Sequence, residues 1–368
     1  MSGIEVHGAG LAGSSAAIAA RLCGAEVDLY DPSPFPRQKV CGEFLSPEVL
    51  PILDALGLSE QFLELKPVRY TRLHLQFGTH SQVSALSEPA FGLSRFALDH
   101  LLVRHAQAFG ATLHRQRAPR AAAQGQGIRP TVTALGRHAA GSRASAPRGR
   151  RCFGFKAHFQ GDPLAPLTLY FDRSTYIGVN QVEGGFTNVC GIAPEPELAK
   201  VRFRVDDFLA TLPGFSALLA PLRRSMSWIT TGPVLYKQDF NQYCNRQYPA
   251  GDALSFLDPF TGSGQLCALL TGAIAGFCAA HHTPADAYLA LCQGALRRPF
   301  WAASAIRAIL RTPLAATAAG LVPVTWLMRA TRPVMTDKVL MLLEMLKKEN
   351  RRILGGRYPP VGSLTWAR

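Results

Sequence analysis

The chain has 368 residues, of which 48% are hydrophobic and 17% charged, so it carries enough apolar material for a large folded core and lacks the composition of a disordered protein. Its formal net charge of +14 favours anionic partners such as phosphates, an anionic membrane surface or an acidic carrier protein. Nucleic acid is not the expected partner, because no recognition helix, zinc finger or RNA-binding aromatic signature accompanies the charge.

The eight cysteines are scattered along the chain, without a C-x-x-C pair or a short spacing to histidine. No metal site is therefore expected, and the thiols are expected to be reduced in a cytoplasmic protein. The opening residues MSGIEVHGAG lack the basic and apolar regions of a signal peptide, which favours the same location.

The N-terminal stretch predicts a dinucleotide-binding Rossmann unit. A strand, a turn with the spacing G-x-G-x-x-G, a helix of small residues and a second strand follow one another between residues 4 and 30. Gly8 would allow the tight turn, Gly10 the close approach of a pyrophosphate, and Gly13 the packing of helix on strand. Asp31, about 20 residues after the turn, would accept hydrogen bonds from the adenosine ribose.

The next loop, PSPFPRQKVCGEFLSP at residues 32–47, decides which dinucleotide is expected. It resembles the loop that runs beside the flavin in FAD-dependent oxidoreductases of the geranylgeranyl reductase and aromatic hydroxylase superfamily. Cys41, Gly42 and Glu43 match that loop residue by residue. The resemblance implies FAD as the cofactor, contacts from these three residues, and a catalytic role for Cys41. The alternative for Cys41 is a small buried residue in a tight loop.

Residues 93–113 predict an amphipathic helix that ends at Gly110, followed by a short strand. The segment is similar to the superfamily's helix whose arginine lies near the ribityl or phosphate part of FAD, and Arg95 is the match. Pairing with a pyrophosphate would give this charge a physical purpose, whereas a plain surface arginine is the alternative.

A motif of the type DATGR or GADGR follows in the superfamily, where it helps to hold FAD and influences the use of NAD(P)H. The chain has PTVTALGRHA, which keeps Gly136 and Arg137 but has no acidic residue at Thr133 or Leu135. The resemblance implies that Gly136 contacts FAD and that NAD(P)H is the reductant. The lost carboxylate and the short polar stretch at 114–130 leave open a degenerate flavin-binding scaffold.

Two basic stretches flank the second half of the chain. No acidic residue occurs between Asp99 and Asp162, while arginines accumulate there, and a second basic run starts at Lys347. Either stretch would suit an acidic carrier protein or an anionic membrane surface, and a solvated surface without a partner is the alternative.

From Cys152 the pattern predicts an antiparallel sheet, with strands at 152–160, 167–172, 176–182 and 186–193. Lys156 and His158 fall on one face of the first strand, opposite its phenylalanines. The resemblance makes this sheet the substrate domain, whose inner face covers the flavin ring. A catalytic or substrate-orienting role for Lys156 and His158 is one interpretation, and solvent-facing polar alternation is the other.

The stretch PAGDALSFLDPFTGSGQLCALLTGAIAGFCAAHH, residues 249–282, resembles the second FAD signature of the superfamily. The resemblance implies that Asp252 binds the ribityl chain, that Pro259 lies against the ring and that the turn 261–264 offers backbone N–H groups to the pyrimidine edge. Asp258 is expected to order the turn. The expected cofactor contacts here are Gly251, Asp252, Pro259, Gly262, Ser263 and Gly264.

The predicted fold class is therefore α/β, with a Rossmann-type FAD-binding domain, an inserted antiparallel substrate domain and a helical C-terminal region. The FAD-binding domain is expected from residues 1–65, 94–150 and 245–283. The substrate domain is expected from residues 66–93 and 151–244. Residues 284–368 form the helical basic region, whose uncharged run of about 17 residues is short for a membrane span and fits core packing or peripheral membrane contact at the inner face.

The expected function is that of an FAD-dependent monooxygenase or hydroxylase acting on a hydrophobic substrate, polyketide-like, aromatic or lipid-like. One alternative is a carbon–carbon double-bond reductase of the geranylgeranyl reductase type, and the other is the degenerate scaffold. A flavin halogenase is disfavoured, because the four tryptophans form no W-x-W-x-I-P motif.

Overall fold

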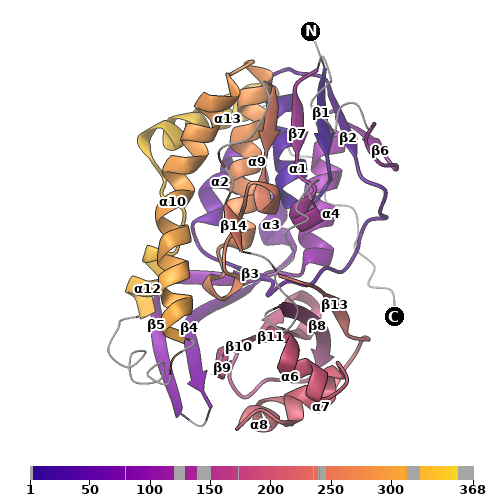
Figure 1. Ribbon diagram of the computed structural model, residues 1–368. Helices are drawn as coiled ribbons and strands as arrows, with labels where there is room; N and C mark the ends of the chain where they lie inside the picture. The colour runs from indigo at the N-terminus through magenta and orange to yellow at the C-terminus, as the bar shows by residue number, and fades with distance from the viewer. Residues whose placement is uncertain are drawn as a thin grey trace.

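A computed structural model describes residues 3–78, 80–119, 129–138, 151–172, 174–234, 236–238, 240, 246–310, 312 and 324–354. Two sheets organise these residues, one parallel and flanked by helices, the other large and mostly antiparallel (Figure 1). Parts of both predicted basic stretches, residues 120–128, 139–150 and 355–368, lie outside the described residues.

The parallel sheet has five strands in the order β15-β7-β1-β2-β6, and every neighbouring pair is parallel. Its strands come from all three segments that were predicted to form the FAD-binding domain. Parallel pairing between distant segments requires crossover connections. The connection from β1 to β2 contains a helix, whereas the connection from β7 to β15 contains strands of the second sheet. The strands are β1 (Ile4–His7), β2 (Val27–Tyr30), β6 (Thr112–His114), β7 (Thr131–Thr133) and β15 (Gln247–Pro249).

The apolar helix α9 (Gly264–Ala280) packs along α1 (Leu11–Leu22) in the core of this domain. Glycines make the close approach possible, because a Cβ added to Gly272 would stand 2.2 Å from the Ala12 carbonyl oxygen and one added to Gly276 would stand 2.1 Å from that of Ala16. The hydrophobicity of α9 therefore reflects burial against α1. Within the described part of the chain, no helix combines the length and hydropathy that crossing a bilayer requires.

Other helices complete the core around α1 and α9. The helix α4 packs on α1, and α13 packs on α2. Their bounds are α2 (Val49–Ala55), α3 (Ser59–Glu64), α4 (Arg95–Ala108) and α13 (Asp337–Leu354).

The second sheet has nine strands, with the path β12-β8-β11-β10-β9-β4-β5-β3 and β13 paired to β8. The four strands predicted from Cys152 onward, β8, β9, β10 and β11, pair antiparallel as expected, whereas β4 joins them by running parallel to β9. The β4–β5 hairpin enters from a separate part of the chain, so no tight turn forces β4 to oppose β9. The short β3 also extends this sheet from within the segment 1–65.

The strands of the large sheet are β3 (Phe44–Leu45), β4 (Val68–Phe77), β5 (His80–Gly92), β8 (Cys152–Gln160), β9 (Leu167–Asp172), β10 (Thr175–Val182), β11 (Phe186–Pro194), β12 (Arg223–Arg224) and β13 (Ile229–Thr231). A separate pair joins β14 (Lys237–Gln238) to β16 (Ser255–Phe256).

The two faces of β8 have different environments, as the alternation predicted. Phe155 and Phe159 pack with Phe208 and Phe215 under short helices at the outer face of the sheet. Lys156 is buried on the opposite face, which is turned toward the parallel-sheet domain. The outer helices are α6 (Glu195–Lys200), α7 (Val205–Ala210) and α8 (Phe215–Leu219).

The C-terminal region is helical, as predicted. The helix α10 (Ala285–Leu310), which contains Pro299, runs along one side of the molecule toward α12 (Val324–Ala330) and the β4–β5 hairpin (Figure 1). Lys347 of α13 forms an ion pair with Asp54 of α2 at 2.6 Å. Part of the second basic run is therefore engaged within the protein.

Among the described residues, short 3-10 turns occur at η1 (Gly136–His138), η2 (Glu183–Gly185), η3 (Gly251–Ala253) and η4 (Pro259–Thr261).

Candidate functional site

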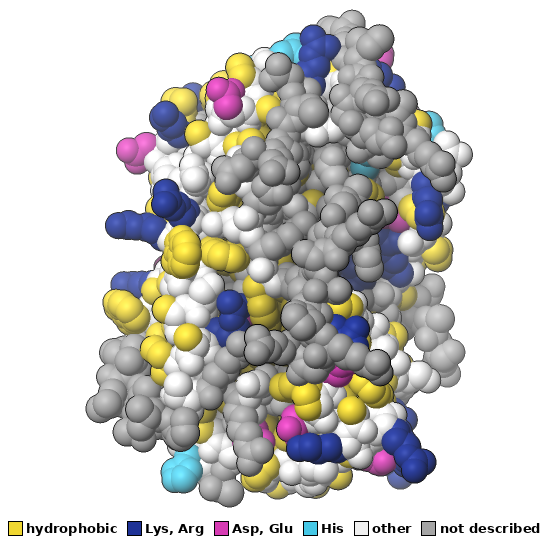
Figure 2. Space-filling view, in the orientation of Figure 1, with side chains coloured by type: hydrophobic (Ala, Val, Ile, Leu, Met, Phe, Trp, Pro, Cys, Tyr) yellow, Lys and Arg dark blue, Asp and Glu magenta, His cyan; other side chains and the backbone are white. Residues whose placement is uncertain are grey.

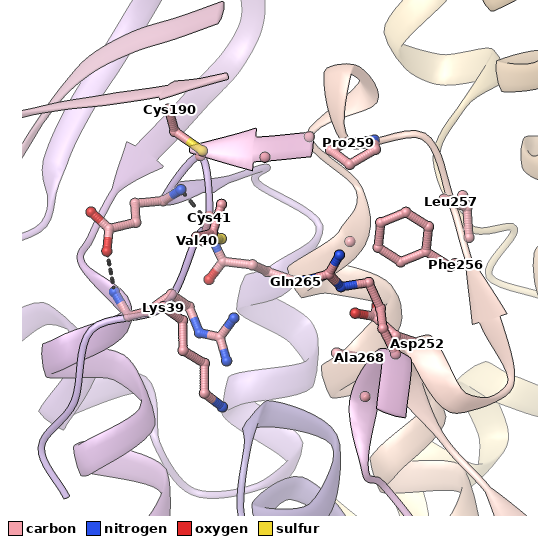
Figure 3. Close-up of a pocket in the computed structure, with 18 of the residues that line it drawn as sticks. Lys39, Val40, Cys41, Cys190, Asp252, Phe256, Leu257, Pro259, Gln265 and Ala268 are labelled. Atoms are coloured by element: carbon pink, nitrogen blue, oxygen red, sulfur yellow. Dashed lines mark hydrogen bonds between the residues drawn. The ribbon is translucent and has the colours of Figure 1, made fainter. Parts of the chain in front are cut away.

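A cavity of about 1210 Å³ lies where the carboxyl ends of the parallel strands meet the large sheet. Residues that follow β1, β2, β7 and β15 line it, which is the edge where ligands bind in open α/β sheets. The lining residues come from distant parts of the chain, as the close-up in Figure 3 shows for Lys39, Cys190 and Asp252.

The glycine-rich turn has the geometry that its predicted roles need. Gly8 has a φ of +97°, which favours glycine, and a Cβ added there would stand 2.4 Å from the Ala134 carbonyl oxygen. A Cβ added to Gly13 would stand 1.7 Å from the carbonyl oxygen of Gly8. Gly13 thus permits the helix to pack on the turn, and the first turn of α1 faces the cavity through Gly10 and Leu11.

An excess of positive charge surrounds this helix start. The Lys39 ammonium lies 3.0 Å from the Asp99 carboxylate and would stand 3.1 Å from a Cβ added to Gly10. The Arg95 guanidinium donates two hydrogen bonds to the same carboxylate, at 2.6 and 2.9 Å. Two cations therefore share one anion beside a helix N-terminus, an arrangement that suits a pyrophosphate.

Asp99 is the buried counter-ion of this group. Burial by itself raises the pKa of the Asp99 carboxyl, but the charges of Arg95 and Lys39 outweigh burial and lower the pKa to about 2. Asp99 and Lys39 were not identified from the sequence, although the basic character of the loop around residue 37 was visible. Arg95 lines the cavity as expected, with its guanidinium held by Asp99.

Asp31 lies at the end of β2, where the dinucleotide pattern predicts an acid. Its Oδ2 accepts a hydrogen bond from the backbone N–H of Ala9 at 3.0 Å. Arg37 donates to both carboxylate oxygens, at 2.8 and 2.7 Å. Burial raises the pKa of Asp31, but the hydrogen bonds from Arg37 and the backbone outweigh burial and lower it. A ribose would have to share this carboxylate with Arg37.

Glu43 joins the two domains through a buried charge cluster. Its carboxylate accepts a hydrogen bond from Lys156 Nζ at 2.5 Å and lies 2.7 Å from His158 Nε2. The backbone N–H of Arg95 donates to the same carboxylate at 2.8 Å, and Gln38 accepts from Lys156 Nζ at 2.7 Å. Glu43 also has a φ of +52°, an uncommon conformation for a residue with a side chain.

The cluster excludes the interpretation that Lys156 and His158 face solvent, because both side chains are buried. Burial raises the pKa of Glu43, but the charges of Lys156 and His158 and their hydrogen bonds outweigh burial and lower it. Glu43 lines the cavity, whereas Lys156 and His158 stand behind it and do not belong to the described lining. Their contact with the cavity therefore runs through Glu43, and their predicted catalytic role stays a prediction.

Cys41 and Gly42 precede Glu43 and also line the cavity. Burial raises the pKa of the Cys41 thiol, so the thiol stays protonated at neutral pH. Cys190 of β11 lines the same cavity and lies near Cys41 (Figure 3). Among the described residues, no cluster of His, Cys, Asp or Glu is arranged to hold a metal ion.

The second predicted signature forms the opposite wall. Gly251 has a φ of +63°, and its N–H donates to Thr271 Oγ1 of α9 at 2.9 Å. Asp252 and Pro259 line the cavity, and η3 lies against η1, so that Gly136 of the altered TALGR motif also reaches the lining. Asp258 orders the turn as expected, since its side chain accepts from the N–H of Phe260.

A residue of the C-terminal region holds the turn 261–264. Arg332 is buried and donates to the Thr261 carbonyl oxygen at 2.7 Å and to Ser263 Oγ at 2.8 Å. Ser263 Oγ donates to the Thr331 carbonyl oxygen at 2.8 Å, so its side chain has a structural role. Gly262, in the left-handed conformation, and Gly264 line the cavity. The sequence contained no signal that linked Arg332 to this turn.

The far half of the cavity is an apolar chamber, which the sequence did not reveal. One wall is the inner face of β4 and β9, and the other comes from α10 and α12. We call this half the apolar chamber; its aliphatic and aromatic lining comprises Leu73, Leu75, Phe77, Leu167, Leu169, Phe171, Phe260, Ile306, Ile309, Leu310, Leu327 and Met328. Such a lining is typical of a site for a hydrophobic ligand.

One polar group lies at the chamber wall. The hydroxyl of Tyr176 is buried and has no hydrogen-bond partner among the residues that the structure describes. Burial raises the pKa of this hydroxyl well above its usual value, so the group stays protonated. A buried hydroxyl without a partner is costly, so this hydroxyl is able to donate to an atom that enters the cavity, either an ordered water or a ligand.

These residues fit FAD. The glycine-rich turn and the Lys39 and Arg95 charges would hold a pyrophosphate, and Asp252 would hold a ribityl chain. Space for the cofactor remains beside Gly42 and Gly264, which lie between these groups, because a Cβ added at either glycine would meet nothing within 4 Å. When bound, FAD would supply electron transfer and hydride chemistry, while the chain would supply position and a water-poor chamber.

Comparison with known proteins supports this interpretation of the fold. No family model matches the chain. The solved structure of the flavin-dependent brominase Bmp2 has a TM-score of 0.75 at 16% identity, over 96% of this chain and 99% of the brominase. A flavoprotein/dehydrogenase from Cytophaga hutchinsonii has a TM-score of 0.74 at 15% identity, over 97% of this chain and 100% of that protein.

A geranylgeranyl bacteriochlorophyll reductase-like protein from Thermoplasma acidophilum has a TM-score of 0.69 at 17% identity, over 96% of this chain and 98% of that protein. In sequence, the chain is 34% identical to the menaquinone reductase of Mycobacterium tuberculosis (strain ATCC 25618 / H37Rv) over 115 residues, which are 30% of this chain and 28% of that protein. The match thus spans little more than a quarter of the curated relative. The chain has the fold of these flavoproteins.

Proposed function

We propose, from the premise that the chain has the fold of FAD-dependent oxidoreductases, that it binds FAD and carries out a redox reaction on a hydrophobic substrate. The observation that carries the proposal is that one cavity of about 1210 Å³ joins the glycine-rich turn and the Lys39 and Arg95 charges to an apolar chamber. A cofactor and a hydrophobic substrate would meet inside it.

The cofactor end would hold FAD through its phosphates and its ribityl chain. Gly10 and the start of α1 offer backbone N–H groups, and Lys39 and Arg95 add charge beside them. Glu43, fixed by Lys156 and His158, would keep the loop 41–43 in one conformation against the flavin. Preorganised loops of this kind reduce the ordering that binding requires.

The chamber end supports a lipid-like, polyketide-like or aromatic substrate. Aliphatic and aromatic side chains favour apolar contacts over hydrogen bonds, so the affinity would come from hydrophobic burial. Tyr176 would donate a hydrogen bond to an oxygen of the substrate and so orient it. The substrate is therefore expected to be largely hydrocarbon with a carbonyl or hydroxyl group.

Oxygenation of this substrate is the reaction that we favour, because a chamber lined by apolar side chains excludes the water that competes with oxygen transfer. NAD(P)H would be the reductant. The purified protein is expected to be yellow and to contain about one FAD per chain. For an oxygenase, its rate of NADPH oxidation is expected to rise when oxygen and a hydrophobic substrate are both present.

Reduction of a carbon–carbon double bond is the second candidate. The protonated Tyr176 hydroxyl favours it, because a double bond that receives a hydride on one carbon needs a proton on the other. The resemblance over 115 residues to a menaquinone reductase adds support. In this case substrate-dependent NADPH oxidation would continue without oxygen, and Tyr176→Phe would lower the turnover number more than it raises KM.

If neither oxygenation nor double-bond reduction is observed, the remaining alternative is a catalytically degenerate flavin-binding scaffold. A colourless protein that cannot be reconstituted with FAD would overturn the enzymatic proposal. A yellow protein without turnover under either condition would favour a flavin-binding scaffold, which the missing carboxylate of the TALGR motif at Thr133 and Leu135 would explain.

A further inference from the structure

We propose that the outer face of α10 and α12 docks on an anionic lipid bilayer, and that the hydrophobic substrate enters the apolar chamber from the bilayer beside Ile309. The docking face rests on exposed side chains alone. Only the entry of substrate rests on the proposed function.

The second half of α10 exposes apolar side chains where a helix of a water-exposed surface would carry polar ones. Trp301 is 64% exposed and Ile309 is 48% exposed, and the exposed residues between them on this face are Ala305 and Ala308. Trp326 on α12 is 61% exposed. Tryptophan is enriched at the membrane–water interface, because its ring is apolar and its N–H can still reach water or a headgroup.

The charges on the same face are all positive. Arg297 and Arg298 are exposed one turn before Trp301, and Arg329 is exposed on α12. No acidic residue occurs in the sequence between Gly294 and Leu310 or within α12. Figure 2 shows Lys or Arg side chains among hydrophobic ones along the edge of the molecule over α10 and α12. Basic and aromatic side chains around an apolar face are typical of peripheral binding to anionic lipids.

The chamber lies directly behind this face. Ile306, Ile309 and Leu310 of α10 line the chamber, as do Leu327 and Met328 of α12. Ile309 is both half-exposed and part of the lining, so it marks a place where the chamber approaches the outer surface. A substrate in the bilayer would need to pass only this layer of side chains and would avoid water.

The composition of the face favours a bilayer over an acidic carrier protein. Two tryptophans and an isoleucine dominate it, whereas the three arginines lie at its margins. On α13, two of the basic side chains are engaged within the protein, because Lys347 pairs with Asp54 and Arg352 pairs with Glu349. An acidic partner would be expected to meet a more continuous basic surface.

The test is flotation of the full-length protein with vesicles of phosphatidylcholine alone or of phosphatidylcholine with phosphatidylglycerol. The wild type is expected to float with the anionic vesicles only. The variant Trp301→Ala/Trp326→Ala and the variant Arg297→Glu/Arg298→Glu are each expected to lower the partition coefficient by about tenfold or more. Trp301, Trp326, Arg297 and Arg298 are all exposed, so folding is expected to persist in both variants.

Two matched controls separate the face from the general basic charge of the protein. Arg223→Glu/Arg224→Glu reverses another exposed arginine pair, on β12, and Leu164→Ala removes another exposed apolar side chain. Both controls are expected to float like the wild type. The docking face would be overturned by either of two vesicle results: an equally large loss of vesicle binding in Arg223→Glu/Arg224→Glu, or no binding of the wild type to anionic vesicles. It would also be overturned if the protein bound an acidic carrier protein but not vesicles.

The FAD absorbance and turnover of the same samples distinguish this inference from the proposed function. A colourless protein that floats with vesicles would overturn the proposed function and leave the docking face intact. A yellow protein that turns over a short, water-soluble substrate and does not float would overturn the docking face alone. If the inference is correct, Trp301→Ala/Trp326→Ala loses about tenfold in turnover of a vesicle-borne substrate and keeps the turnover of the water-soluble one.

Discussion

The Lys156 ammonium donates a hydrogen bond of 2.5 Å to the Glu43 carboxylate, and both side chains are fully buried where the two domains meet. One residue comes from the loop that lines the cofactor end of the cavity, and the other comes from the large sheet. The pair therefore ties the conformation of the loop 41–43 to the position of the large sheet.

Removal of Lys156 is expected to destabilise the protein strongly. The variant Lys156→Met leaves the Glu43 carboxylate buried with His158 as its remaining cationic partner, and the loss of one partner of a buried pair costs about 3–5 kcal/mol. Urea unfolding measures the loss. The matched control is Lys200→Met, which breaks an exposed pair with Glu197 and is expected to change stability by less than about 1 kcal/mol. Equal losses of unfolding free energy in the two variants would contradict a stabilising role of the buried Lys156–Glu43 pair.

Asp99 is expected to make stability depend on pH in the acid range. Its pKa is lowered from 3.8 to about 2 in the folded protein, so its stabilising contribution is complete above pH 3.8 and is lost as the pH falls toward 2. The shift corresponds to about 2 kcal/mol. The variant Asp99→Asn is expected to lose about this amount at neutral pH and to show a flatter stability profile between these two pH values.

Urea unfolding at a series of pH values checks this prediction. Asp206, an exposed aspartate on α7, provides the control substitution Asp206→Asn, for which the profile is expected to match the wild type. If the dependence of unfolding free energy on pH is the same in Asp99→Asn as in the wild type, the buried Asp99 carboxylate contributes nothing to acid sensitivity.

Two glycine substitutions are expected to separate an effect on folding stability from an effect on FAD affinity. A Cβ on Gly13 would stand 1.7 Å from the carbonyl oxygen of Gly8, so Gly13→Ala should cost at least about 3 kcal/mol of stability. A Cβ on Gly42 would meet nothing within 4 Å, so Gly42→Ala should change stability by less than about 0.5 kcal/mol. If FAD fills that space, Gly42→Ala lowers FAD affinity by about tenfold in a fluorescence titration, because the methyl group occupies it. Unchanged affinity would mean that the cofactor lies elsewhere.

Arg332 is expected to tune the reduction potential of bound FAD. Its charge lies behind the turn 261–264, which the resemblance assigns to the pyrimidine edge of the flavin, where negative charge develops on reduction. Arg332→Met should therefore make the two-electron potential more negative by roughly 30 mV, equivalent to ~1.4 kcal/mol. Spectroelectrochemical titration of the FAD-loaded protein measures the change. Arg329→Met removes an exposed charge nearby and should leave the potential unaltered; a shift of the same size in both variants would argue against a specific role.

Local patterns in the sequence predicted many of the segments that line one end of the cavity. The strand, glycine turn and helix around Gly8 and Gly13, the loop 41–43 and the signature that starts at Gly251 all lie on the cavity wall or support it. These features are recognisable because their geometry depends on contacts within a few residues, such as a positive φ or a helix packed on the preceding turn.

The sequence was less informative about partners. It placed Lys156 and His158 on one face of a strand but left open whether that face meets solvent. It also gave no indication that Arg37 donates hydrogen bonds to both carboxylate oxygens of Asp31. Side-chain partners of this kind follow from how loops fold back on the strands, which alternation does not encode.

By itself, the sequence determined the α/β class, the dinucleotide turn and the apolar, small-residue character of α9, because these depend on local backbone geometry and on periodicity. Only the tertiary structure decided that Glu43 meets Lys156 across 113 positions of the chain, that Arg332 supports the turn at Ser263, and that α10 and α12 close an apolar chamber. Contacts between distant segments depend on chain topology and on how the domains pack, so they emerge only when the whole chain is folded.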